Sequence, residues 1–309
     1  MQKTAYLFPG QGAQHVGMCK ELCANNSGAD AIFDRAEAIS GLPVKKLCFE
    51  GPEEELANTA NAQPCIFAAS AALLAVVKDF ISKPDICAGL SLGEYSALYA
   101  AGAVDFDASM RLVTERGRLM QSVAEAGPGG MVAVMGLERE AVEDLCDQAR
   151  ENGILTPANF NCPGQIVVSG DNNACSRAAK LAEEKFEAKA TVLKVAGAFH
   201  SEMMTPAATE FRKVLSEVQF KDPDCPVVTN VDASPTSSAE EIPGKLVEQL
   251  TGAIMWQQSM EMMVSGGLKR AYEIGPGRTL KGMARRIDRG LEVVTVNSWH
   301  TVTELNVRT

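Results

Sequence analysis

The stretch Gly89-Leu90-Ser91-Leu92-Gly93 decides how this 309-residue chain is organised. Before it stands a short, mostly apolar segment (residues 85–88), and after it a run of helix-forming residues (92–101). A strand, a sharp turn and a helix in this order form a nucleophile elbow, which lifts the serine hydroxyl above the helix N-terminus. A side chain at either glycine would crowd so tight a turn. The pattern therefore predicts an α/β fold with Ser91 as a candidate nucleophile.

Length and composition predict a globular protein with more than one compact unit. A chain of 309 residues exceeds the usual size of a single core, so we expect two domains, or one domain with an insertion. The net charge of −10 argues against nucleic acid or an anionic membrane as the main partner. No signal peptide is evident, and we expect no apolar run of membrane-spanning length. The expected location is the cytoplasm.

The nine cysteines predict reduced thiols rather than a disulfide framework, because they are odd in number and scattered. His15, Cys19 and Cys23 are spaced four residues apart, as on one face of a helix. This set lacks a fourth ligand and the usual short cysteine spacing, and Gly17 interrupts it. We therefore expect no metal site there.

The first 127 residues alternate between strand-like and helix-like segments. Residues 4–8 predict a buried strand that ends in the glycine-rich turn 9–12, and residues 65–80 predict a buried apolar helix. The turn has neither Gly-Lys-Ser/Thr nor G-x-G-x-x-G, so it gives little support to nucleotide binding. Open α/β sheets place active-site backbone at the C-terminal ends of strands, which makes Gln11 a candidate site residue.

Composition changes at Gly127-Pro128-Gly129-Gly130, where a different pattern begins. Its expected elements are a strand at 131–135, a helix at 138–152, strands at 156–161 and 165–169, a helix at 172–186 and a strand at 190–195. The order βαββαβ is that of a ferredoxin-like subdomain, whose close ends allow its insertion into another domain. We therefore predict a large α/β-hydrolase-like domain with a parallel sheet core (residues 1–127 and 198–309) and an inserted small subdomain (128–197).

A serine nucleophile needs a base, which is almost always histidine. Of the three histidines, His15 follows the first turn and His300 lies near the C-terminus. His200 lies where the predicted insertion returns to the large domain, and clefts form at such junctions. His200 is therefore the best candidate, although no acidic partner with a motif of its own lies between it and Ser91.

Six ordered sequence blocks resemble those of a known family. The blocks are Phe8-Pro9-Gly10-Gln11-Gly12, Gly89-Leu90-Ser91-Leu92-Gly93-Glu94, Glu115-Arg116-Gly117, Ala158-Asn159-Phe160-Asn161, Ala198-Phe199-His200-Ser201 and Glu273-Ile274-Gly275-Pro276-Gly277. Together they resemble the malonyl-CoA:acyl carrier protein transacylases, the acyltransferases of bacterial fatty-acid synthesis, which have related domains in polyketide synthases. The resemblance extends from about residue 4 to residue 296.

The resemblance implies catalytic roles for five residues. Ser91 would take malonyl from CoA as an ester, and His200 would act as general base and acid. The family orients this histidine with a backbone carbonyl, which would belong here to Gln249 and would explain the missing acid. The oxyanion hole would consist of the backbone N–H groups of Gln11 and Leu92.

The resemblance also implies two substrate-binding residues. Arg116 would bind the free carboxylate of malonyl through two parallel hydrogen bonds, where lysine offers only a point charge. Without the resemblance, the sequence favours Arg116 as a surface residue paired with an acid such as Glu115. Phe199 would wall off the space that the branch of methylmalonyl needs. Leu90 departs from the family, in which many members have histidine before the serine, and we expect it to affect packing or subtype rather than chemistry.

The implied reaction is a ping-pong transfer of malonyl from malonyl-CoA to the phosphopantetheine thiol of an acyl carrier protein, by a monomer, with no metal or redox cofactor. Seven basic residues between positions 269 and 289 could form a docking patch for the acidic carrier protein or for CoA phosphates, or they could be solvated helix faces. The alternatives are a malonyl transferase acting in trans in a polyketide pathway, a serine thioesterase or other hydrolase, and a non-catalytic scaffold.

Overall fold

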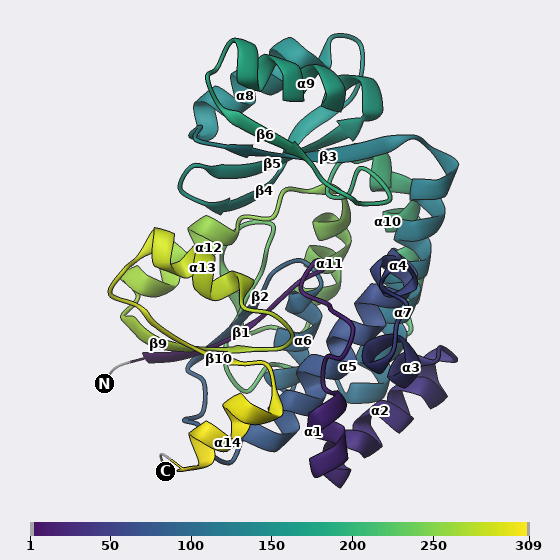
Figure 1. Cartoon of the computed structure of the whole chain (residues 1–309), viewed down its shortest axis with the longest axis vertical. Coiled ribbons are helices and arrows are strands. Elements are labelled where there is room, and N and C mark those ends of the chain that lie inside the picture. The colour runs from purple at the N-terminus through teal and green to yellow at the C-terminus, as the bar shows by residue number, and fades with distance from the viewer. Residues whose placement is uncertain (1–2, 308–309) are drawn as a thin grey trace.

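The computed structural model describes residues 3–307, which form a larger and a smaller β-sheet with helices around them (Figure 1). The larger sheet has the strand order β10-β9-β1-β2-β7-β8. Its strands are β1 Lys3–Phe8, β2 Ile86–Gly89, β7 Val227–Val228, β8 Pro235–Thr236, β9 Leu268–Ile274 and β10 Glu292–Val296. All neighbours are parallel except β7 and β8, which are antiparallel. The ends of the predicted large domain at 1–2 and 308–309 lie outside the described residues.

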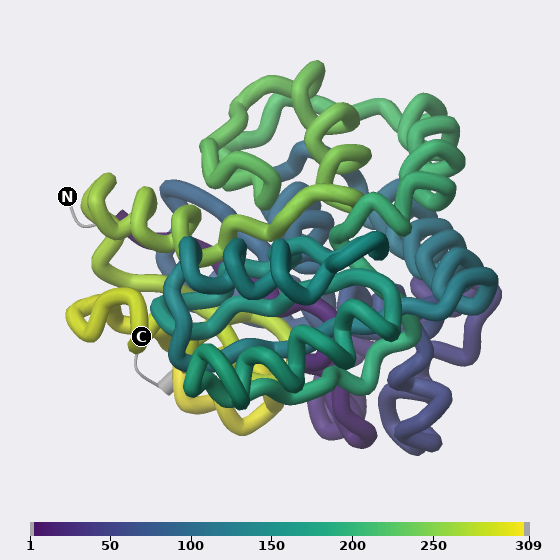
Figure 2. Tube along the Cα trace, turned by 90° about the horizontal axis from the view of Figure 1, so that it is seen from above, coloured from purple at the N-terminus to yellow at the C-terminus, as the bar shows by residue number. Residues whose placement is uncertain are grey.

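The smaller sheet has the order β4-β5-β3-β6 and is antiparallel throughout. Its elements in chain order are β3 Gly129–Met135, α8 Arg139–Arg150, β4 Leu155–Cys162, β5 Gln165–Asp171, α9 Asn172–Glu184 and β6 Lys189–Val192. The predicted order βαββαβ is therefore present. The view from above shows α8 and α9 side by side over the outer face of this sheet (Figure 2).

The other helices surround the larger sheet. They are α1 Lys20–Asn25, α2 Ser27–Ser40, α3 Val44–Phe49, α4 Glu53–Ala57, α5 Thr59–Val77, α6 Gly93–Ala100, α7 Phe106–Ala126, the 3-10 helix η1 Glu202–Met204, α10 Thr205–Ser216, α11 Ile242–Thr251, α12 Trp256–Ser265, α13 Thr279–Ile287 and α14 Trp299–Val307. Sequence patterns did not predict α14 or the two-residue strand β8. Between residues 27 and 57 the chain forms three separate helices, α2, α3 and α4.

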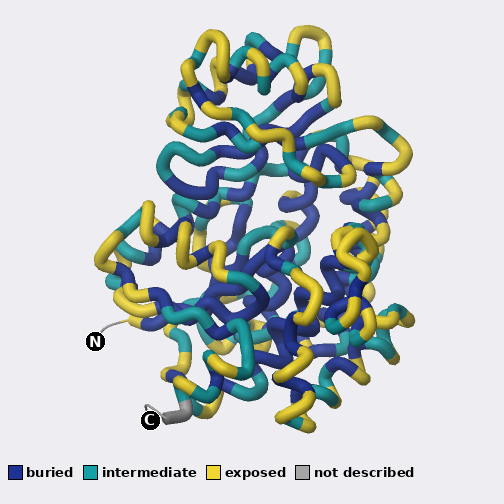
Figure 3. Tube along the Cα trace, viewed as in Figure 1, coloured by how far each residue is buried: buried dark blue, intermediate teal, exposed yellow. Residues whose placement is uncertain are grey.

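Both faces of the larger sheet are covered, as a parallel sheet requires. Along β1, Ala5 and Leu7 pack in one cluster with Trp256 of α12, whereas Tyr6 and Phe8 pack in the other with Phe67 of α5. This alternation explains why β1 reads as a continuous apolar run. The buried backbone follows the larger sheet and the helices beside it (Figure 3).

Helix α5 corrects two expectations. It is 19 residues long, and an 18-residue stretch of it has a mean hydropathy of 1.6. By length and composition it is apolar enough to cross a membrane, so the expectation that no such run exists was wrong. Because 83% of this stretch is buried inside the protein, α5 has the character of a core helix. It also begins at Thr59 rather than near residue 65, because the Asn58 side chain caps it by accepting the Ala60 N–H at 3.0 Å.

The two sheets are joined at several points. A Cβ placed on Gly197 would lie 2.5 Å from the Cβ of Ala124, so the chain segments that enter and leave the smaller sheet pass each other closely. At strand β4, Phe160 N–H donates to the Ile254 carbonyl at 2.9 Å, and Ile254 N–H donates to the Ala158 carbonyl at 2.8 Å. These backbone bonds attach the β4 edge to the chain before α12.

Candidate active site

The site begins where β1 and β2 end side by side. Phe8 is in register with Gly89, and the Leu90 N–H donates to the Phe8 carbonyl at 3.0 Å. A Cβ on Gly89 would lie 1.9 Å from the Gly93 carbonyl carbon, and one on Gly93 would lie 2.1 Å from the Phe8 oxygen. These positions exclude any side chain, as expected for the elbow. Ser91 itself has φ 51°, a left-handed conformation that is strained for a residue with a Cβ.

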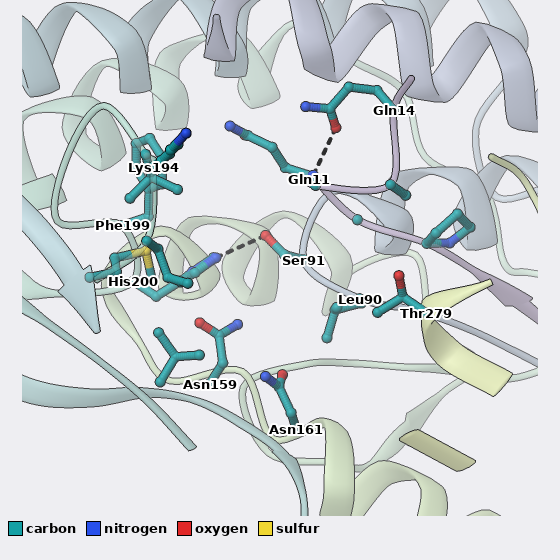
Figure 4. Close-up of a pocket in the computed structure, with 18 of the residues that line it drawn as sticks. Gln11, Gln14, Leu90, Ser91, Asn159, Asn161, Lys194, Phe199, His200 and Thr279 are labelled. Carbon is teal, nitrogen blue, oxygen red and sulfur yellow. Dashed lines mark hydrogen bonds between the residues drawn. The ribbon is translucent and has the colours of Figure 1, made fainter. Parts of the chain in front are cut away.

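Ser91 and His200 are hydrogen-bonded across the site, with Oγ 2.8 Å from Nε2 (Figure 4). On the other side of the ring, Nδ1–H donates to the main-chain carbonyl of Gln249 at 2.7 Å. This carbonyl can only accept, so it fixes the tautomer in which Nε2 is free to receive the serine proton. The segment that returns from the smaller sheet thus brings the histidine to the elbow serine.

Burial keeps His200 neutral. The side chain is 5% exposed, and burial together with the nearby positive charge of Arg116 lowers its pKa from the usual 6.5 to about 3, against the opposing effect of the Gln249 carbonyl. A neutral imidazole at physiological pH is the form that can accept a proton.

Arg116 projects from α7 into the same site and is 1% exposed. Its guanidinium donates to Gln63 Oε1 at 2.7 Å, to Gln249 Oε1 at 2.9 Å and to Ser91 Oγ at 3.2 Å. Its charge also lies over the Tyr95 ring, 5.4 Å from the centroid. The surface alternative was wrong, because Glu115 pairs with the exposed Arg118 instead. Within residues 3–307, no carboxylate forms an ion pair with Arg116, and its Nε has no hydrogen-bond partner.

Two candidate oxyanion donors lie on the neighbouring turns. Gln11 lines the cleft after β1, and Leu92 is fully buried directly after the serine. Neither backbone N–H donates to another group within residues 3–307. The Gln11 side chain donates from Nε2 to Thr59 Oγ1 at 3.2 Å.

A cleft of about 370 Å³ between the two sheets contains the site. Its lining includes Phe199 beside the histidine, Leu90 beside the serine and Thr279 of α13. Asn159 and Asn161 face Ser91 from β4 (Figure 4). His15 and His300 do not line the cleft. His300 is exposed, and its Nε2 lies 3.4 Å from Glu304 Oε1. The structure thus lines one cleft with the predicted residues Gln11, Ser91, Arg116, Phe199 and His200. The fully buried Leu92 and Gln249 do not line it, but Leu92 follows Ser91 directly and Gln249 bonds to His200.

Sequence reasoning missed two residues that contact the elbow. Asn230 bonds to Ser91 and Gly89, and Glu94 bonds to Asn230 and Gln249. Burial raises the pKa of Glu94 to about 7, although its hydrogen bonds and Arg116 act in the opposite direction. Glu94 belongs to the sequence block 89–94, which could have indicated a role at the site. Asn230 follows a two-residue strand and has no local sequence signal.

No group of three metal-ligating side chains is found among residues 3–307. Helix α1 begins at Lys20, so His15, Cys19 and Cys23 do not share a helical face. The seven basic residues between 269 and 289 are exposed, but two of them are engaged: Arg270 pairs with Glu292 at 2.8 Å, and Arg286 donates to the Pro163 carbonyl at 2.6 Å.

The chain is similar to known proteins over almost its whole length. The family described as "Acyl transferase domain" matches residues 5–267. The malonyl CoA-acyl carrier protein transacylase of Bacillus subtilis is 41% identical, with 100% of this chain and 98% of the relative covered. That of Haemophilus influenzae is 39% identical, with 96% of each chain covered.

Two solved structures are similar over almost the whole chain. An acyl carrier protein S-malonyltransferase from Vibrio cholerae has a TM-score of 0.93 at 38% identity, with 98% of this chain and 99% of that chain covered. A malonyl-transacylase solved in complex with a type II polyketide synthase acyl-carrier protein has a TM-score of 0.95 at 37% identity, with 99% and 100% covered. The chain therefore belongs to the acyl transferase family, among its malonyl CoA-acyl carrier protein transacylases.

Proposed function

We propose that the protein is a malonyl-CoA:acyl carrier protein S-malonyltransferase of fatty-acid biosynthesis. Its relatives carry this activity in their names, and the hydrogen bonds of Ser91 to His200 and to the buried Arg116 support it. Malonyl would pass from CoA to Ser91 as an ester and then to the phosphopantetheine thiol of an acyl carrier protein. The seven exposed basic residues between 269 and 289 support an acidic carrier protein as the partner.

The observation that carries the proposal is the placement of Arg116. A buried guanidinium without a carboxylate partner among the described residues, 3.2 Å from the nucleophile, suits an acyl group that ends in a carboxylate. The planar cation can hold both carboxylate oxygens through parallel N–H···O bonds. An uncharged acyl group would leave this cation uncompensated in a buried site.

In the first half-reaction, Ser91 Oγ attacks the thioester carbonyl carbon while His200 Nε2 takes the hydroxyl proton. The backbone N–H groups of Gln11 and Leu92 would stabilise the oxyanion, each contributing roughly 3–4 kcal/mol. When the intermediate collapses, the C–S bond breaks, and the imidazolium returns its proton to the CoA sulfur. The Gln249 carbonyl stabilises that imidazolium through Nδ1–H.

The second half-reaction reverses these steps with a different thiol. His200 takes the proton of the phosphopantetheine thiol, the sulfur attacks the Ser91 ester, and the serine oxygen leaves with the returned proton. One thioester is exchanged for another, so the transfer itself requires neither a metal nor a redox cofactor. We propose that none is used.

The preference for malonyl over methylmalonyl would depend on Phe199. This side chain is 5% exposed and lines the cleft beside His200, where its ring fills space that a methyl branch would need. Leu90 would contribute packing, because it lies against the apolar cluster on the α12 side of the sheet.

We further propose that residues 1–127 and 198–309 form an α/β-hydrolase-like domain and that residues 128–197 form a ferredoxin-like subdomain. The parallel sheet with its elbow supports the first assignment, and the strand order β4-β5-β3-β6 supports the second. We also propose a cytoplasmic monomer. Each cysteine is a free thiol, and all but Cys225 are buried, which suits a reducing compartment.

The test is to incubate the protein with malonyl-CoA, with and without phosphopantetheinylated carrier protein, and to weigh both proteins by mass spectrometry. Transfer predicts a malonyl adduct on Ser91 and then on the carrier. Rapid release of free malonate without a malonylated carrier would support a hydrolase instead. Because a similar malonyl-transacylase was solved with a type II polyketide carrier protein, the polyketide pathway is a second candidate. A competition between fatty-acid and polyketide carrier proteins for the malonyl group distinguishes the two pathways.

A further inference from the structure

Asn230 and Glu94 form a hydrogen-bonded pair directly behind Ser91, and the mechanism above gives neither a role. Both side chains are 1% exposed. Asn230 follows β7, and Glu94 lies in the first turn of α6, the helix that the elbow starts. The Asn230 main-chain N–H donates to Glu94 Oε2 at 3.0 Å. The pair therefore links two separate elements that flank the serine.

The Asn230 side chain holds the elbow on both sides of the serine. Its Oδ1 accepts the Ser91 N–H at 2.6 Å, and its Nδ2 donates to the Gly89 carbonyl at 2.7 Å. An amide donates and accepts within one planar group, which matches these two bonds. The left-handed backbone of Ser91 costs about 1–3 kcal/mol and persists only where its surroundings enforce it. Asn230 supplies that constraint.

Glu94 controls the orientation of Gln249. Its Oε2 accepts Gln249 Nε2–H at 2.7 Å, so Gln249 Oε1 faces Arg116 at 2.9 Å. The main-chain carbonyl of the same glutamine receives the His200 Nδ1–H. The imidazole and the guanidinium thus both depend on a residue whose side chain Glu94 holds in place.

We propose that Glu94 and Asn230 are positioning residues for acyl transfer. Asn230 locks the backbone of Ser91, and Glu94 secures both Asn230 and Gln249. The nucleophile, the base and the carboxylate-binding cation thereby keep their mutual geometry before substrate arrives. The proposal rests on the proposed function, because it concerns the same transfer. A displacement of about 1 Å among such groups lowers the rate by about 100-fold.

The experiment compares Glu94→Ala, Glu94→Gln and Asn230→Ala with the wild type. Intact-mass single-turnover loading and steady-state kinetics give kcat and KM for malonyl-CoA, and thermal unfolding gives Tm. Glu94→Ala and Asn230→Ala should lower kcat by about 100-fold with KM within about threefold, because Arg116 keeps its hydrogen bond to Gln63 Oε1 and still binds the carboxylate. Glu94→Gln keeps an oxygen that accepts both hydrogen bonds, so kcat should recover to within about fivefold of the wild type.

The matched control is Asp171→Asn. Asp171 is a carboxylate in the smaller sheet that accepts the backbone N–H groups of Ile154 and Ala174, and it does not line the cleft. Its amide variant should transfer malonyl at the wild-type rate. If Asn230→Ala does not fold, Asn230→Asp replaces it. This variant keeps an acceptor for the Ser91 N–H, loses the donor to Gly89, and should still lower kcat at unchanged KM.

Three outcomes would overturn the proposal. One is wild-type kcat in folded Glu94→Ala and Asn230→Ala (or Asn230→Asp). Another is an equal loss in Glu94→Gln and Glu94→Ala, which would assign the effect to charge rather than to hydrogen-bond geometry. The third is a loss confined to KM. Absence of a malonyl adduct on the wild type would instead refute the proposed function, so the two failures are distinguishable.

Discussion

Replacing Arg116 with alanine separates recognition of the malonyl carboxylate from the chemistry of transfer. In the wild type the guanidinium can bind malonyl through two charge-assisted hydrogen bonds in a fully buried site. Each such bond is worth about 1.5–3 kcal/mol, so the variant should lose about 3–6 kcal/mol for malonyl. At 1.36 kcal/mol per tenfold, this corresponds to a loss of about 10²- to 10⁴-fold in kcat/KM.

Acetyl transfer should respond differently, because acetyl has no carboxylate. Arg116→Ala removes a positive charge that lowers the pKa of His200, so the imidazole becomes a stronger base. We expect acetyl transfer to change by less than about tenfold. Because a higher pKa keeps the imidazole protonated up to a higher pH, the acid limb of the acetyl pH–rate profile should move upward in the variant.

The assay measures kcat/KM for malonyl-CoA and acetyl-CoA, with transfer to a carrier protein as the readout. Arg118→Ala is the control, because Arg118 lies on the same helix but is exposed and pairs with Glu115. It should leave the malonyl-to-acetyl ratio unchanged. Equal losses for both substrates in Arg116→Ala would refute the carboxylate-binding role.

Three further predictions follow from the same geometry. Phe199→Ser should raise methylmalonyl transfer relative to malonyl by about 1–3 kcal/mol, measured as a kcat/KM ratio, and an unchanged ratio would remove Phe199 from the specificity argument. Gly89→Ala should prevent folding or greatly lower Tm, since its Cβ would lie 1.9 Å from a backbone carbon, whereas Gly282→Ala, with open space around it inside helix α13, should keep or slightly raise the wild-type Tm. Below pH 6.5 the unfolded chain protonates His200 while the folded protein, with a pKa of about 3, does not, so stability should fall by up to about 1.4 kcal/mol per pH unit. His200→Gln should show a shallower decline in Tm between pH 7 and 5, and parallel curves would contradict the buried neutral histidine.

The sequence predicted those features that depend on local pattern. The elbow, the first strand and the alternating elements of the smaller sheet are encoded in glycine spacing and in apolar periodicity, and the structure contains them. Ordered motif blocks led to Arg116, whose burial contradicts the usual exposure of helix charges.

What the sequence did not reveal depends on long-range contact. Asn230 bonds to Ser91 across 139 positions, and Glu94 bonds to Gln249 across 155, so no short window contains either relation. The early start of α5 depends on a single cap residue, Asn58. Strand β8 is only two residues long, which is too short to show periodicity.

The backbone bonds between Ile254 and strand β4 attach the smaller sheet to the chain before α12 along its β4 edge. They anchor the side of the cleft that carries Asn159 and Asn161. Leu193, Lys194 and Val195 also line the cleft, just past the end of β6, and the Leu193 N–H donates to the Met131 carbonyl of β3 at 2.9 Å. Because the Ile254 bonds join β4 to the chain before α12, Asn159 and Asn161 should keep their distance from Ser91 when the long arm of a thioester enters the cleft.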